Sequence, residues 1–134
     1  MIEGDSKDYP LLTNAAERVA KLESKQPLLT AEIGVRRGLG SKLIMEYIRP
    51  IYSGLHFHIG IDPYGDLRYP HSDKGEPLVA DYNSKMKSEH LKDFADKENY
   101  QFLNLTDMKF FEKYFNGVVF YDQGKEYHIN TYHL

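Results

Sequence analysis

Residues 28–44 constrain the fold more than any other stretch of the chain. They read Leu-Leu-Thr-Ala-Glu-Ile-Gly-Val-Arg-Arg-Gly-Leu-Gly-Ser-Lys-Leu-Ile, an apolar run followed by three glycines within seven residues. Apolar side chains then recur at helical spacing at Leu43, Ile44, Tyr47 and Ile48. A buried strand, a glycine turn and a helix are therefore predicted in direct succession. Glycines let the backbone turn sharply and approach a ligand, and the free N–H groups at a helix start favour an anionic group.

A second strand is predicted from residue 55 to residue 61, and it ends at Asp62. Apolar and other side chains alternate along Leu-His-Phe-His-Ile-Gly-Ile, and the turn-forming residues 63–65, Pro-Tyr-Gly, follow. In a parallel strand–helix–strand unit the ends of the two strands lie side by side. Asp62 stands 22 positions after Gly40, and an acidic residue at about that distance can accept hydrogen bonds from ribose hydroxyls.

The spacing of the glycines narrows the kind of ligand. The order G-x-x-x-G-x-G differs from the G-x-G-x-x-G of dinucleotide-binding domains, and Glu32 stands two residues before the first glycine. The order Gly40-Ser41-Lys42 excludes a Walker-type phosphate loop. A carboxylate at the end of the first strand is unfavourable beside a pyrophosphate, but it suits a ligand that carries an ammonium group.

The pattern Glu32-x-Gly34-x-x-x-Gly38-x-Gly40, followed by Asp62, resembles motifs I and II of the class I S-adenosylmethionine-dependent methyltransferases, especially the type that acts on small molecules. The resemblance covers about residues 28–110 and implies a Rossmann-like sheet. It also implies that the glycine loop contacts the methionine part of the cofactor, that Asp62 holds the ribose hydroxyls, and that Tyr64 and Asp107 lie near the adenine. The implied cofactor-binding residues are Glu32, Gly34, Gly38, Gly40, Ser41, Asp62, Tyr64 and Asp107.

Three functions stay open at this point. The first is a methyltransferase that binds S-adenosylmethionine and passes its methyl group to a small-molecule acceptor by in-line attack, for which the sequence names no catalytic base. The second is an NAD-type dinucleotide-binding domain, and the third is a non-catalytic fragment or interaction module of a methyltransferase fold. For the two carboxylates, separate alternatives stay open: Glu32 only caps the loop amides, and Asp62 only forms an Asp-Pro-Tyr-Gly turn.

Two histidines, His56 and His58, share one face of the second predicted strand. Such a pair is a possible start for a metal site, but no third ligand stands near it in the sequence. A partly buried structural pair is therefore favoured, and no metal ligand is assigned. The chain has no cysteine, which excludes disulfides and thiolate ligands.

Length and composition bound the class of protein. A chain of 134 residues predicts one Rossmann-like domain over residues 1–134. Lys and Arg total 17 against 20 Asp and Glu without a basic stripe, so a nucleic-acid partner is not expected. The N-terminus is polar and acidic, and no 18 apolar residues run together. These features predict a cytoplasmic protein with no membrane partner.

The periodicity and turn signals along the chain predict its elements. A lead-in helix is expected over residues 11–22, with Asn14 and Glu17 as a capping pair. The other predicted elements are a strand over 28–34, a helix over 40–49, a strand over 55–62, a surface loop and potential lid over 63–80, a helix over 83–98, a strand over 100–105, a helix over 108–115 that stops at Gly117, and a hairpin of 118–121 and 126–129.

Three parallel strands form only the first half of a doubly wound sheet. In class I methyltransferases a fourth strand lies beside the first, and the sequence stops about where that strand would begin. The fold is therefore predicted to be an α/β, Rossmann-like three-layer sandwich with a partial parallel sheet, a C-terminal hairpin and an incomplete C-terminus. The first strand would have an unpaired edge, which favours a homo-oligomer through that edge unless another chain or the hairpin covers it.

Overall fold

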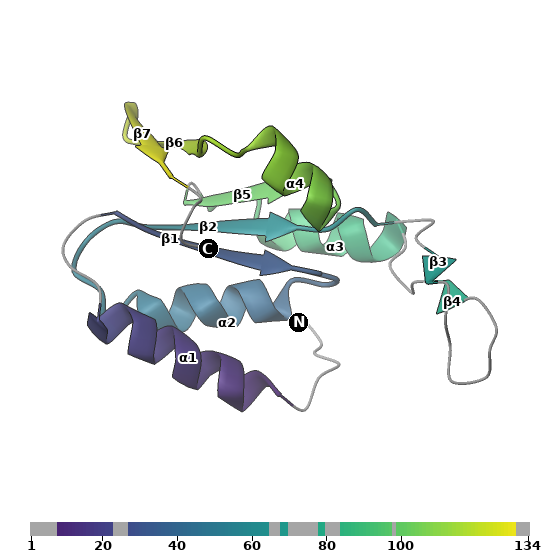
Figure 1. The fold of residues 1–134 in the computed structure, drawn as a ribbon. Coiled ribbons are helices and arrows are strands. Elements are labelled where there is room, and N and C mark those ends of the chain that lie inside the picture. Colours follow the sequence, from purple (N-terminus) through teal and green to yellow (C-terminus); the bar gives the residue numbers. More distant parts are fainter. Residues whose placement is uncertain are drawn as a thin grey trace.

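The computed structural model describes residues 8–22, 27–64, 68–69, 78–79, 84–97 and 99–130. The chain contains both helices and strands along its whole described length (Figure 1). In order, the elements are α1 (Tyr9–Leu22), β1 (Leu28–Ile33), α2 (Leu39–Ile48), β2 (His56–Ile61), β3 (Arg68–Tyr69), β4 (Leu78–Val79), α3 (Ser84–Asp93), β5 (Tyr100–Leu103), α4 (Asp107–Lys113), β6 (Val118–Asp122) and β7 (Lys125–Ile129).

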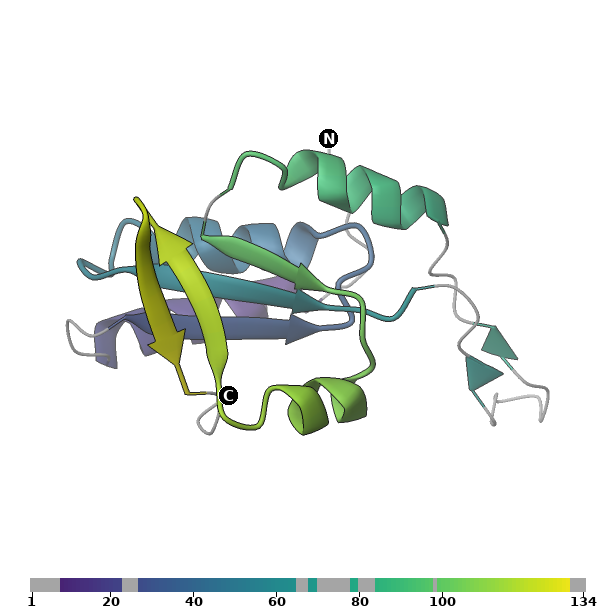
Figure 2. The ribbon, with the colours of Figure 1, turned by 90° about the horizontal axis from the view of Figure 1, so that it is seen from above.

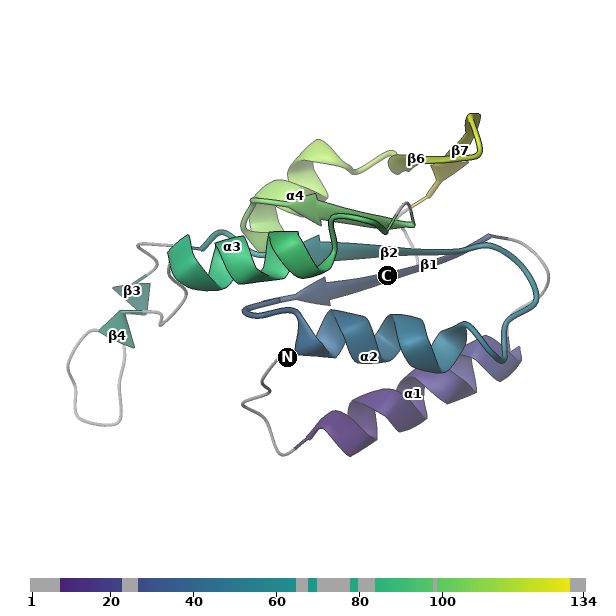
Figure 3. The ribbon, with the colours of Figure 1, turned by 180° about the vertical axis from the view of Figure 1, so that it is seen from behind.

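A three-stranded parallel sheet with the order β1-β2-β5 forms the centre of the molecule. Helices α1 and α2 cover one face of this sheet, whereas α4 and the β6–β7 hairpin lie over the other (Figure 1). Helix α3 lies along the β5 side of the sheet (Figure 2), on the same side as α2 (Figure 3). The structure is thus a mixed α/β fold with a parallel sheet and a separate antiparallel hairpin.

Strand β2 is buried along its whole length, and its two faces differ in chemistry. Phe57, Ile59 and Ile61 belong to an apolar cluster, because successive side chains of a strand point to opposite faces. The other members of that cluster are Leu103, Phe110, Val118 and Phe120. The opposite face of β2 carries His56, His58 and Gly60, and it faces α2. The central strand is therefore apolar toward the hairpin and polar toward α2.

Helix α1 packs against α2 through small and apolar side chains at helical spacing. Ala16 and Ala20 are buried, and Leu12 lies one turn before them. Leu28, Ile44, Ile48 and Tyr52 complete this second cluster. Among the described helices, none is long and apolar enough to cross a membrane.

The β6–β7 hairpin is closed by a two-residue turn at Gln123 and Gly124, which have φ angles of 50° and 79°. Two positive φ values in succession match the twist of antiparallel strands, and glycine adopts the second without strain. Phe120 then stacks on Phe57 with ring centroids 4.7 Å apart. The hairpin therefore covers the apolar face of β2 and leaves the edge of β1 unpaired within the described residues.

Most of the predicted elements are confirmed within a few residues, including Gly117 with a φ of 115° after α4. The proposed capping pair is wrong, because α1 begins at Tyr9 and Asn14 lies inside it. The helix predicted to reach residue 98 ends at Asp93, because the N–H groups of Ala95 and Lys97 bond to carbonyls three residues back.

The segment predicted as a loop over residues 63–80 contains a short antiparallel pair, β3 with β4. The two strands have two residues each. Most of the rest of this segment lies outside the described residues. Its role as a lid therefore stays a prediction.

Phe120→Ala should lower the free energy of unfolding by about 3–5 kcal/mol, because it removes a ring that is 3% exposed and stacked on Phe57. Tyr121→Ala is the matched control, since Tyr121 is the next residue of β6 and is 60% exposed; it should change stability by less than about 0.5 kcal/mol. Urea unfolding measures both. Equal effects of the two substitutions would show that the hairpin does not pack on β2.

Candidate functional site

The turn between β1 and α2 has an unusual backbone conformation. Gly34, Arg36 and Gly38 have φ angles of 85°, 56° and 94°. Gly38 is the N-cap of α2 and has no side chain with which to cap it. The N–H groups of the first turn of α2 therefore need an acceptor from another part of the chain.

Glu32, near the end of β1, supplies that acceptor. The Ser41 hydroxyl donates to Oε1 of Glu32 at 3.0 Å, and the backbone N–H of Ser41 also donates to this carboxylate. Gly40 makes the approach possible, because a Cβ at position 40 would overlap Oε2 of Glu32. The carboxylate thus caps α2 from a neighbouring strand.

Burial raises the pKa of Glu32 from 4.5 to about 7. The two hydrogen bonds from Ser41 oppose this shift, and the charge of Asp62 adds to it. None of the causes among the described residues is a cation. Glu32 is therefore a largely but not fully buried carboxyl group, and its raised pKa places its change of charge near neutral pH.

Asp62 follows β2 and is fully buried. Its Oδ2 accepts a hydrogen bond from the N–H of Arg36, and its Oδ1 accepts one from the N–H of Tyr64, each at 2.9 Å. The first of these bonds joins the glycine loop to the end of β2. Asp62 therefore holds the conformation of two loops, and its proposed contact with ribose stays a prediction.

Three further polar rings lie beneath this loop. The Tyr64 hydroxyl donates to the carbonyl oxygen of Arg36 and lies 3.2 Å from Nδ1 of His90. Nε2 of His90, on α3, hydrogen-bonds to the Tyr100 hydroxyl. Tyr100 belongs to β5, where Gly60 leaves space for it, because a Cβ at position 60 would overlap the Tyr100 hydroxyl. The loop is thus supported by side chains from both β5 and α3.

A polar layer that the sequence does not reveal continues from Ser41 along the sheet. Nε2 of His58 lies 2.8 Å from the Ser41 hydroxyl, and Thr30 Oγ1 lies 2.7 Å from His58 Nδ1 and 2.6 Å from His56 Nε2. The register pairs Thr30 with His58, which explains why these groups meet. The Thr30 hydroxyl thus joins the two histidine rings. In the described part of the chain, no three metal-ligating side chains gather into a possible metal site.

The structure brings seven of the eight sequence-predicted residues into one region. Glu32 and Ser41 bond directly, Gly34, Gly38 and Gly40 shape the loop between them, and Asp62 and Tyr64 hold that loop in place. Asp107 is exposed at the start of α4, where the side chain of Thr106 caps the helix. Its assignment to the adenine amine stays a prediction.

Comparisons with known proteins add no relative. No protein-family model, no curated protein and no solved structure matches the chain.

Glu32→Gln should change how stability depends on pH. The pKa of Glu32 is about 7 in the fold against an ordinary value of 4.5, so the folded state holds the proton more tightly. The contribution of Glu32 to stability is complete at a pH below its ordinary pKa of 4.5. It is lost as the pH rises through the folded-state pKa of about 7. The native protein should therefore lose about 3 kcal/mol relative to Glu32→Gln between about pH 4.5 and pH 8. Urea titrations across that range measure the difference.

The buried histidines do not affect the difference in stability between the native protein and Glu32→Gln. Burial lowers the pKa of His56 and of His90 to about 4 and that of His58 to about 3, so their contribution is lost as the pH falls below 6.5. That loss is common to both proteins and cancels in the difference. Glu112→Gln, an exposed site on α4, is the control and should follow the native protein. A constant difference between native protein and Glu32→Gln would contradict the raised pKa.

Proposed function

We propose that this chain is the cofactor-binding part of a Rossmann-like, S-adenosylmethionine-dependent methyltransferase that acts on a small-molecule acceptor. The observation that carries the proposal is the Glu32 carboxyl group, which is largely buried beside the start of α2 and whose pKa shift has no cation among its causes in the described part of the chain. A ligand ammonium group would supply the missing positive charge. S-adenosylmethionine carries such a group in its methionine part.

The arrangement around Glu32 supports this assignment. The end of β1, the glycine loop and the end of β2 lie together, because β1 and β2 are parallel neighbours with Glu32 opposite Gly60. Nucleotide-like ligands of open α/β sheets bind at the carboxyl ends of the strands. Glycines at positions 34 and 38 provide the positive φ angles that let a loop backbone approach a ligand.

Binding of ribose hydroxyls to Asp62 requires part of the structure to move. Each of its oxygens already accepts one backbone N–H, and each has capacity for a second hydrogen bond. Because the side chain is fully buried, ribose hydroxyls reach it only after Tyr64 or the glycine loop moves. When bound, the cofactor supplies the methyl group, and the residues of this chain hold and orient it.

S-adenosylhomocysteine, the demethylated cofactor, should bind and do so more weakly as Glu32 becomes protonated. With a pKa of about 7 for Glu32, the dissociation constant should rise roughly tenfold between about pH 8 and pH 6. Glu32→Gln should weaken binding by a similar factor and remove the dependence on pH. Titration calorimetry measures both effects.

Glu112→Gln is again the matched control and should keep the affinity of the native protein. Binding of NADH without binding of S-adenosylhomocysteine would replace the methyltransferase proposal by an NAD-type domain. Binding of neither ligand would favour a non-catalytic module.

The free edge of β1 is proposed to pair with the β1 strand of a second copy. A groove of about 350 Å³ runs beside it, lined by apolar side chains that include Val19, Ile33 and Phe111. These three side chains are 38%, 54% and 46% exposed. A two-fold axis would place the same groove on both partners, so that each copy covers the other.

Ile33→Lys should convert such a dimer into a monomer, because a charge on an exposed edge strand opposes pairing with another strand. Light scattering after size-exclusion chromatography measures the mass. Tyr121→Lys, on the exposed face of β6, should leave the mass unchanged. A native protein that is monomeric at high concentration would refute the dimer.

A further inference from the structure

The polar layer between the sheet and α2 forms one continuous hydrogen-bond chain. It runs from Glu32 to Ser41, from Ser41 to His58, from His58 to Thr30 and from Thr30 to His56, with successive distances of 3.0, 2.8, 2.7 and 2.6 Å. Ser41 and His58 are fully buried, and His56 is 9% exposed. The proposed function uses only the Glu32 end of this chain.

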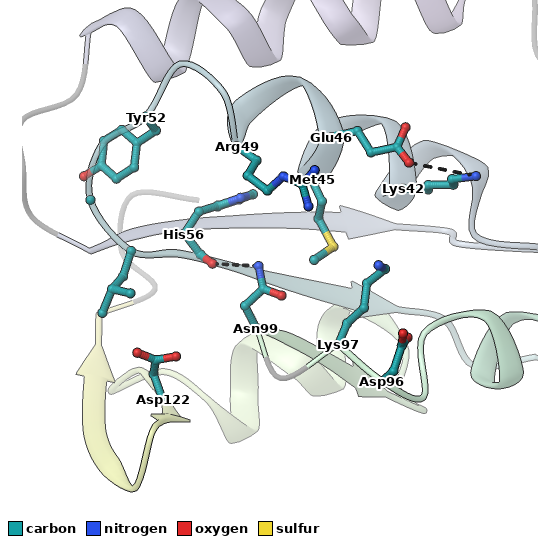
Figure 4. Close-up of a pocket in the computed structure, with 12 residues that line it drawn as sticks. Lys42, Met45, Glu46, Arg49, Tyr52, His56, Asp96, Lys97, Asn99 and Asp122 are labelled. Carbon is teal, nitrogen blue, oxygen red and sulfur yellow. Dashed lines mark hydrogen bonds and ion pairs between the residues drawn. The ribbon is translucent and has the colours of Figure 1, made fainter.

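The His56 end opens on a cleft of about 520 Å³ between α2 and the segment that leads into β5 (Figure 4). Arg49, the C-cap of α2, and Asn99 approach His56 from opposite sides, and the Asn99 amide donates to the His56 carbonyl oxygen at 3.1 Å (Figure 4). The charged residues that line this cleft are Lys42, Glu46, Arg49, Asp96, Lys97 and Asp122. His56 is therefore the point at which the buried chain meets a polar cavity.

The direction of each hydrogen bond follows from counting protons. Burial keeps both histidines neutral at pH 7, so each ring carries one N–H. The single Ser41 hydroxyl proton is donated to Glu32, so Nε2–H of His58 must donate to Ser41. Nδ1 of His58 then accepts from the Thr30 hydroxyl, which in turn accepts from Nε2–H of His56. With Glu32 ionised, every donor points toward the carboxylate.

We infer that this chain of hydrogen bonds is a proton relay between the His56 cleft and Glu32. Nδ1 of His56 takes a proton from the cleft, and Nε2 of His56 gives its proton to Thr30. Thr30 passes its own proton to Nδ1 of His58, Nε2 of His58 passes one to Ser41, and Ser41 passes one to Glu32. One proton enters and one carboxyl group becomes neutral, so the count balances.

The relay reverses the polarity of the chain from end to end. After transfer, both imidazoles are still neutral but carry their proton on Nδ1, and His56 presents an N–H donor where it presented a lone pair. The charge on Glu32 is thereby reported at the cleft as a change from hydrogen-bond acceptor to donor. A ligand cation that keeps Glu32 ionised fixes the acceptor form.

Other titratable groups face this chain from neighbouring elements. Asp62, after β2, and the Tyr100 hydroxyl, from β5, both face Glu32, and burial raises the pKa of Tyr100, which keeps it protonated. His90, from α3, faces His58 and helps to lower its pKa. The Tyr100 hydroxyl also hydrogen-bonds to Ser41. The charge of Asp62 adds to burial in raising the pKa of Glu32, and so in setting the pH at which the relay reverses.

Nitrogen-15 NMR of the histidine rings tests the relay without any ligand, so its outcome is independent of the methyltransferase proposal. In the native protein, His56 and His58 should carry their proton on Nε2 at about pH 8.5. They should shift it to Nδ1, while staying neutral, as the carbon-13 signal of the Glu32 carboxyl group titrates near pH 7. His128, on the exposed hairpin strand, supplies the reference ring.

Thr30→Val removes the hydroxyl that joins the two rings and keeps a β-branched side chain. His58 should then still follow Glu32, whereas His56 should lose its response. Thr30→Ser keeps the hydroxyl and should keep the response of both rings. Histidine tautomers that stay fixed while Glu32 titrates in the native protein would overturn the relay, and so would a His56 response that survives Thr30→Val.

Discussion

The burial of β2 on both faces is the constraint on which the rest of the structure depends. A central parallel strand of this kind is usually apolar throughout. Here Phe57, Ile59 and Ile61 are apolar, but His56 and His58 place imidazoles beneath α2. Buried polar groups are costly unless they are hydrogen-bonded, so the neighbouring strand and helix must provide partners at matching heights. Thr30 and Ser41 do so, and they fix the register of β1 and the rotation of α2 about its axis.

The two carboxylates at the strand ends, Glu32 and Asp62, also have a structural role. A glycine N-cap leaves the first backbone N–H groups of α2 without a partner from the N-cap side chain. Glu32, on β1, accepts a hydrogen bond from one of them. Asp62 accepts the amide of Arg36 and thereby holds the other side of the loop. A ligand at this site would therefore change the balance of bonds that hold the loop, and binding would be coupled to its conformation.

Much of this architecture could be predicted from local patterns, because those patterns act over a few residues. The alternation of β2, the glycine turn before α2 and the two-residue turn at Gln123 and Gly124 each specify their own conformation. The polar layer could not be predicted in the same way. Thr30 and Ser41 are ordinary strand and helix residues in sequence, and they become partners of His58 only through the register of β1 with β2 and the packing of α2. The position of Asn14 could not be predicted either, because a capping motif inside a helix has the same sequence as one at its start.

The polar layer also affects a conflict between ionisation and burial at Glu32. Glu32 must be ionised to attract a cation, yet its burial favours the neutral form. A direct path to solvent would resolve that conflict by hydrating the carboxylate, at the expense of the electrostatic attraction that a water-poor site provides. In the proposed relay, the hydrogen-bond chain through Ser41, His58 and Thr30 gives the proton of Glu32 a second route, toward the His56 cleft. The site can then be strongly attractive to a cation when charged and stable when neutral.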